Sequence, residues 1–186
     1  MSAKRLESGE CLLTTPSLMR SLAAIMTEVL FYHLERARAE DVLPQLVQRS
    51  LERGWRAVVQ SVSEERVEQL SRLLWTWADD EFLAHGTASD GHAELQPIWL
   101  TPGNDTPNAA TVRILVDGAQ HDILDGLDRL VIMFDGADET AVSAARQKWK
   151  QVTAVAGVTA TYWQQDERGR WVKKATAGEG TATSDQ

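Results

Sequence analysis

The sequence of 186 residues holds a single cysteine, Cys11, and no long apolar run. One cysteine cannot close an intrachain disulfide or form a CxxC metal site, and such sparse use fits a reducing cytoplasm. A membrane-spanning helix needs about 18 consecutive apolar residues, so we expect no membrane segment. Pro16 and Arg20 interrupt the first apolar stretch, which disfavours a secretory signal. We interpret residues 1–25 as a disordered leader or a misassigned start before Met26.

The glycine-rich phosphate motifs are missing too. The segment 33–36 follows the first expected strand where GxGxxG would stand, and GxxxxGK[ST] occurs nowhere. Without those glycines the backbone has no cradle for a pyrophosphate. The four histidines lack zinc-site spacing, no GxSxG elbow is present, and the carboxylates at 79–81 lack a calcium-loop pattern. We therefore expect no catalytic residue, no metal and no cofactor.

What is present indicates one globular α/β domain, because 43% of the residues are apolar and 25% charged. Asp41, Ser63 and Asp138 are the expected caps of three helices, about 41–53, 63–77 and 138–156. Strand-like runs alternate with them, which favours a three-layer sandwich with a mostly parallel sheet flanked by helices, Rossmann-like without the nucleotide motif. The domain should span 26–174, with a disordered tail at 175–186. The expected strands are 29–34, 55–59, 97–100, 112–116, 130–134, 158–163 and 171–172.

Charge is unevenly distributed along the chain. The formal net charge is −8, yet residues 141–174 contain seven basic and two acidic side chains. Such segregation favours a docking surface for an anionic partner. A solvated helix face followed by a polar tail explains the same counts, so both interpretations stay open at this point.

The third expected helix places three side chains of interest on one face. At about 100° per residue, Trp149 lies about 60° to one side of Arg146 and Lys150 about 40° to the other. The indole then lies at the edge of the buried stripe, beside two cations. It is either a core residue or the aromatic wall of a receptor for a carboxylate followed by an apolar ring, as at the end of a polypeptide chain.

Six short segments, in this order and spacing, resemble the chi subunit of bacterial DNA polymerase III. The resemblance runs from Met26 to about Lys174. The segments are 27–34, 53–56, 73–77, 81–86, 96–100 and 145–150.

That resemblance implies a non-catalytic accessory subunit of the clamp-loader assembly, cytoplasmic and associated with the replisome. It would link the assembly, through the small psi subunit, to the acidic C-terminal tail of single-stranded-DNA-binding protein, and would contact DNA only indirectly. The implied tail site is Arg146, Trp149 and Lys150. The implied psi contact is Trp75 and Phe82, for which core packing is the alternative. A repair helicase is a further implied partner.

Two other functions remain open from the residues alone. One is a nucleotide-binding α/β enzyme whose motif is disguised. The other is direct binding of a single-stranded nucleic acid by stacking bases on aromatic rings beside basic residues. The residues for that platform are Trp163, Trp171, Arg168, Arg170, Lys173 and Lys174.

Overall fold

The computed structural model describes residues 26–78 and 82–178, which form seven strands and three helices. None of the helices in these two ranges is long and apolar enough to cross a membrane. The elements are β1 (Thr27–Leu34), α1 (Ala39–Glu52), β2 (Ala57–Gln60), α2 (Glu64–Trp75), β3 (Ile98–Thr101), β4 (Val112–Leu115), β5 (Arg129–Asp135), α3 (Glu139–Thr153), β6 (Val158–Gln165) and β7 (Trp171–Gly178).

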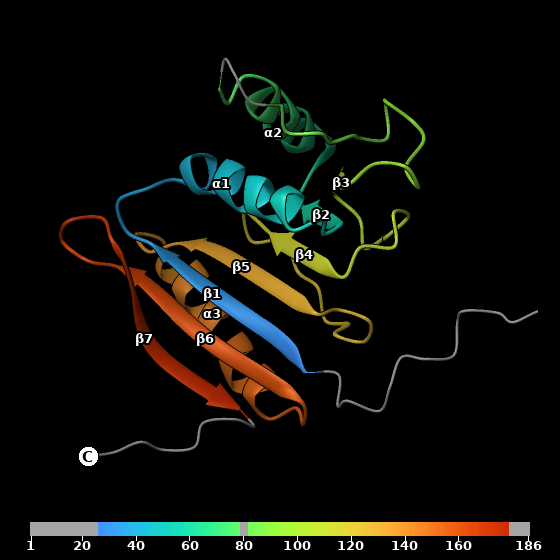
Figure 1. Ribbon diagram of the computed structural model, residues 1–186. Coiled ribbons are helices and arrows are strands. Elements are labelled where there is room, and N and C mark those ends of the chain that lie inside the picture. The colour runs from blue at the N-terminus through green and yellow to red at the C-terminus, as the bar shows by residue number, and fades with distance from the viewer. Residues whose placement is uncertain (1–25, 79–81, 179–186) are drawn as a thin grey trace, which may run out of the picture.

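The strands form one sheet in the order β3-β2-β4-β5-β1-β6-β7. All neighbouring pairs are parallel except β6 and β7, which are antiparallel. Helices α1 and α2 lie on one side of the sheet and α3 lies on the other (Figure 1). This confirms the predicted α/β sandwich with a mostly parallel sheet.

Strand β1 lies inside the sheet, and its residues alternate between the two layers. Phe31 packs with the core under α3, whereas Leu30 belongs to the core under α1 and α2. Strand β6, next to β1, alternates in the same way: Tyr162 contacts the α3 core and Trp163 the α1 core. Consecutive residues therefore serve opposite faces, as the two-residue period of a strand requires.

The helix starts follow local capping chemistry. The side chain of Ser63 accepts a hydrogen bond from the backbone N–H of Arg66, and Asp138 caps α3 in the same manner, both as predicted. The first helix differs from the prediction. It begins at Ala39, and Asp41 occupies its third position, where the carboxylate accepts the backbone N–H of Arg38 at 2.9 Å.

Two helices end earlier than their apolar periodicity predicts. Helix α2 ends at Trp75, so Trp77 packs against the core from outside the helix. Helix α3 ends at Thr153, whose hydroxyl donates to the carbonyl of Trp149 at 2.8 Å. Gly157 then turns the chain into β6. Its φ is 75°, a left-handed conformation that glycine adopts at little cost.

Strand β7 is longer than the sequence predicts. It includes residues 175–178, which we expected in the tail, because they pair with β6. The pairing shifts register between Tyr162 and Trp163, and Lys174 is the extra residue of this bulge. The expected leader at 1–25, the carboxylates at 79–81 and the remaining tail at 179–186 lie outside the described residues.

One charged side chain is part of the core. Arg113, in β4, is 0% exposed, and burial lowers the pKa of its guanidinium. One of its nitrogens donates to the Gln60 side chain at 2.7 Å; another donates to the carbonyl of Asp105 at 2.8 Å and the hydroxyl of Thr106 at 2.6 Å. Arg113 thus joins β2 and β4 to the loop that follows β3.

Candidate functional site

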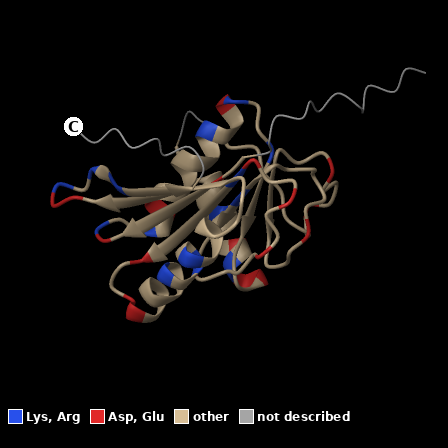
Figure 2. Ribbon diagram, turned by 90° about the horizontal axis from the view of Figure 1, so that it is seen from below, with Lys and Arg blue, Asp and Glu red and all other residues tan. Residues whose placement is uncertain are grey.

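Helix α3 covers one side of the sheet and carries basic residues along its length (Figure 2). Arg146 and Lys150 are exposed, and Trp149, at one end of the same arc, is half-buried. Within residues 26–78 and 82–178, no ion pair engages either Arg146 or Lys150. Two cations without an ion pair to any described residue therefore lie next to one aromatic ring.

The indole of Trp149 is held by two aromatic rings from the sheet. Its centroid lies 5.3 Å from that of Phe31 and 6.0 Å from that of Tyr162, both in edge-to-face geometry. Ala145 and Val152 on α3 are buried against the same core. Such pairs stabilise beyond their area burial, so the indole is fixed in orientation while part of it stays accessible.

Tyr162, like Phe31, is a component of this cluster that the sequence analysis did not predict. Its hydroxyl lies 3.0 Å from Nδ1 of His33, whose ring stacks on Phe134 at 5.1 Å. Burial raises the pKa of Tyr162, and the nearby positive charge of Arg146 opposes that rise. Tyr162 therefore lies within electrostatic reach of Arg146 and in contact with Trp149.

The third cation of the helix has a structural role. Lys148 donates to the backbone carbonyl of His121 at 2.9 Å and to the carboxylate of Asp122 at 2.5 Å. Its side chain is only 13% exposed. The bond to Lys148 lowers the pKa of Asp122. Lys148 fastens α3 to the loop after β4, and it is not available to a partner.

A second surface contains the two residues predicted for the psi contact. Trp75 is 59% exposed and Phe82 is 66% exposed, with ring centroids 5.3 Å apart. Core packing is therefore excluded for both. The chain around Phe82 is anchored by buried Leu83 and by His85, whose ring nitrogens lie 2.7 Å from the Leu83 carbonyl and 3.0 Å from the Ser71 hydroxyl.

A cavity of about 510 Å³ lies at the carboxyl ends of β1 and β5, where nucleotide-binding sheets hold their ligand. In this chain the loop after β1 turns the backbone N–H groups of Glu35, Arg36 and Ala37 toward Oε1 of Gln165, at 3.4, 3.2 and 3.1 Å. The side-chain oxygen of Gln165 thus accepts the backbone N–H groups that would otherwise bind a phosphate. No group of three potential metal ligands occurs in the described ranges.

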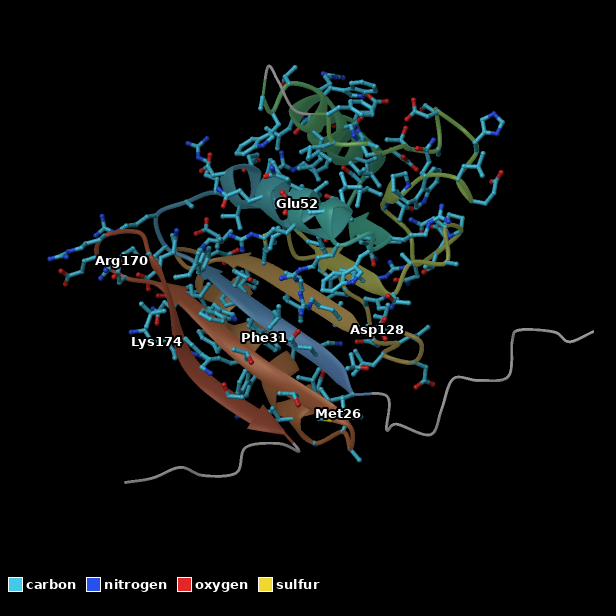
Figure 3. The ribbon with its side chains drawn as sticks, in the orientation of Figure 1. Met26, Phe31, Glu52, Asp128, Arg170 and Lys174 are labelled. Carbon is cyan, nitrogen blue, oxygen red and sulfur yellow. The ribbon has the colours of Figure 1, made fainter. Side chains whose placement is uncertain are left out.

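The residues considered for direct nucleic-acid binding separate into two places. Trp163 and Trp171 pack against the core under α1, and Lys173 lies opposite Trp163 in the sheet register. Arg170 lies near the hairpin between β6 and β7 and is ion-paired with Asp166 (Figure 3). Arg168 and Lys174 are exposed.

Comparison with known proteins places this chain in a family. Residues 26–161 match the family described as DNA polymerase III chi subunit, HolC. The probable DNA polymerase III subunit chi of Rickettsia prowazekii (strain Madrid E) is 24% identical over 91 residues, which span 49% of this chain and 55% of that protein. The chain thus aligns with about half the length of this curated relative. Because the family match covers most of the chain, the protein belongs to the DNA polymerase III chi-subunit family, whose members are accessory subunits in DNA replication.

Proposed function

We propose that this protein links the clamp loader of DNA polymerase III, through the psi subunit, to the acidic C-terminal tail of single-stranded-DNA-binding protein. It would do so in the cytoplasm, as part of the replisome and without catalysis of its own. The observation that carries the proposal is the arrangement of Arg146, Trp149 and Lys150 along one turn of α3, with both cations free of ion pairs to described residues.

The chemistry of that arrangement suits a chain end rich in carboxylates. The planar guanidinium of Arg146 can hold a carboxylate through two parallel hydrogen bonds, and the ammonium of Lys150 adds a second charge one turn away. Trp149 and Tyr162 supply an aromatic wall against which the ring of a terminal phenylalanine can pack. The tail site would therefore read both the charge and the terminal ring of its ligand.

Replacing Arg146 or Lys150 by alanine is expected to weaken binding of a synthetic acidic peptide ending in phenylalanine by about tenfold, since each loses charged hydrogen bonds. Isothermal titration calorimetry at low and at 0.15 M salt measures the effect. The wild-type affinity itself should fall as salt screens the exposed charges.

Arg168→Ala is the matched control, because Arg168 is also an exposed cation but lies outside α3. It should leave peptide affinity unchanged. Unchanged affinity in both the Arg146 and Lys150 variants would reject the site. An equal loss of affinity in all three variants would show that the peptide is attracted by overall charge and not by this site.

The exposed pair of Trp75 and Phe82 fits the psi contact. Exposed aromatic rings in contact are typical anchors of protein interfaces, where truncation of an anchor costs about 2 kcal/mol or more. Trp75→Ala and Phe82→Ala should each abolish coelution with the psi subunit in gel filtration and should shift the free energy of unfolding by less than about 0.5 kcal/mol. Ile123→Ala, at 62% exposure on another loop, is the control. Coelution that survives both aromatic substitutions would place the psi contact elsewhere.

A further inference from the structure

On the sheet face opposite α3, no helix lies in front of β6 and β7 in Figure 1, while α3 lies behind them. Helix α1 packs on the neighbouring β5, and Leu30 and Leu34 of β1 are buried in the core on this side. We call the part of this face over β1, β6 and β7 the open face. Half-buried aromatic rings from all three strands line this face. They are Tyr32, Trp163 and Trp171.

These rings enclose a hollow beside α1. A cavity of about 160 Å³ has Tyr32, Trp163 and Trp171 as its aromatic walls, and Gln45 and Arg49 of α1 border it. The rings of Tyr32 and Trp171 meet edge to face at 4.8 Å. The hollow therefore offers aromatic surface, an amide that can hydrogen-bond a base edge, and a guanidinium, which together suit a nucleobase and its phosphate.

A second cavity, of about 190 Å³, continues the hollow along α1 and shares Tyr32 and Arg49 with it. It ends at Trp55, whose ring is covered by the guanidinium groups of Arg53 at 4.7 Å and Arg129 at 4.8 Å. The two cavities form one path along which aromatic rings and cations alternate. A backbone of several nucleotides can follow such a path, whereas a single small molecule would fill only part of it.

The charge of this face has the opposite sign to that of the whole chain. Arg49, Arg53 and Lys173 form no ion pair with any described residue. Arg129 is ion-paired with Glu28. The negative charge of Glu28 acts to raise the pKa of Tyr32, whereas the positive charges of Arg49 and Arg129 act to lower it. Glu52 lies at the end of α1 and is exposed (Figure 3). The local excess of cations complements a polyanion.

We propose that this open face binds single-stranded DNA, with bases stacked on Trp163, Trp171 and Tyr32 and phosphates held by Arg49 and Lys173. The strand β7 and most of the hairpin leading to it lie beyond residues 26–161, which match the chi family. The face is thus an addition to the surfaces proposed for the tail and for psi. The net charge of −8 describes the whole chain and not this face.

Fluorescence anisotropy of the full chain with a labelled 15-mer of deoxythymidine tests the proposal. Trp163→Ala is expected to weaken binding by about tenfold or more, and Trp163→Phe should keep most of the affinity. Lys173→Ala and Arg49→Ala should each lower the salt slope of log K by about 0.7, the value for one phosphate contact with a single strand. An abasic 15-mer should bind at least tenfold more weakly than the thymidine strand.

Two controls separate this face from the other surfaces. Arg72→Ala removes an exposed cation on α2 and should leave binding unchanged. Arg146→Ala should weaken binding of the acidic peptide and leave binding of the oligonucleotide unchanged. Circular dichroism verifies the fold of each variant, and Lys173, being exposed, can be replaced without loss of packing.

Three results would overturn the proposal. If the abasic strand bound as tightly as the thymidine strand, the bases would not contribute to binding by stacking. Wild-type affinity in the Lys173→Ala and Arg49→Ala variants would place DNA elsewhere. Loss of peptide binding instead of oligonucleotide binding in Trp163→Ala would make the face a peptide site.

Discussion

Arg113→Ala is expected to lower the free energy of unfolding by about 4 kcal/mol, a large share of the roughly 5–15 kcal/mol that stabilises a domain. The substitution leaves a cavity in place of a side chain that is 0% exposed. It also removes the donors that serve the Gln60 side chain and the carbonyl of Asp105. Buried acceptors without partners cost about 1–3 kcal/mol each.

Denaturation in guanidinium chloride, followed by tryptophan fluorescence, measures this loss. Arg72→Ala is the matched control, because the Arg72 side chain is 76% exposed and the change should cost under about 0.5 kcal/mol. Arg113→Lys keeps a charge but supplies fewer donors in one plane, so it should fall between the two. A loss below about 1 kcal/mol for Arg113→Ala would show that the loop after β3 does not depend on this guanidinium.

Gly136→Ala is expected to cost about 2–3 kcal/mol and also to disturb the tail site. A β-carbon at Gly136 would lie 2.3 Å from Nε2 of His33 and 2.8 Å from the carbonyl oxygen of Leu34, so the ring and the turn must both move. His33 is the hydrogen-bond partner of Tyr162, which contacts Trp149. We therefore expect a loss of a few fold in affinity for the acidic peptide as well as lower stability.

The variant His33→Ala/Gly136→Ala tests the cause. Removing the imidazole relieves the closest clash, so the double substitution should destabilise by less than the sum of the two single ones. Gly103→Ala is the comparison, since its β-carbon would meet one oxygen of the Asp105 carboxylate at 2.9 Å but no backbone atom closer than 4.0 Å. Additive single effects would show that strain in the turn, and not contact with His33, sets the cost.

The sequence predicts the fold where local chemistry decides it. The sequence predicts the helix caps at Ser63 and Asp138 because a cap depends on residues close to it along the chain. The same holds for the apolar strands of the sheet. The predicted start of α1 was wrong because an aspartate can cap a helix from its third position, as Asp41 does, as well as from the N-cap position. Strand β7 was too short in the prediction because residues 175–178 have weak strand propensity and are held by pairing with β6.

The same limit applies to the tail site. Arg146, Trp149 and Lys150 share an arc by helix geometry alone, so their juxtaposition could be predicted. Phe31 and Tyr162 could not, since they reach Trp149 only once β1 and β6 are adjacent under α3.

Whether Trp75 faces the core or solvent was equally open from the sequence. It follows Leu74, which is buried, at the very end of α2. Adjacent residues on a helix differ by about 100° in direction, and a helix end can leave either of them exposed.

The bulge at Lys174 has a consequence for self-association. β7 is the last strand of the sheet in the described part of the chain, and a regular edge strand invites a second molecule to add its own strand. The extra residue kinks and twists β7, and Lys173 and Lys174 would bring like charges together if two such edges met. The protein can therefore have β7 at the edge of its sheet without that edge promoting strand addition between molecules.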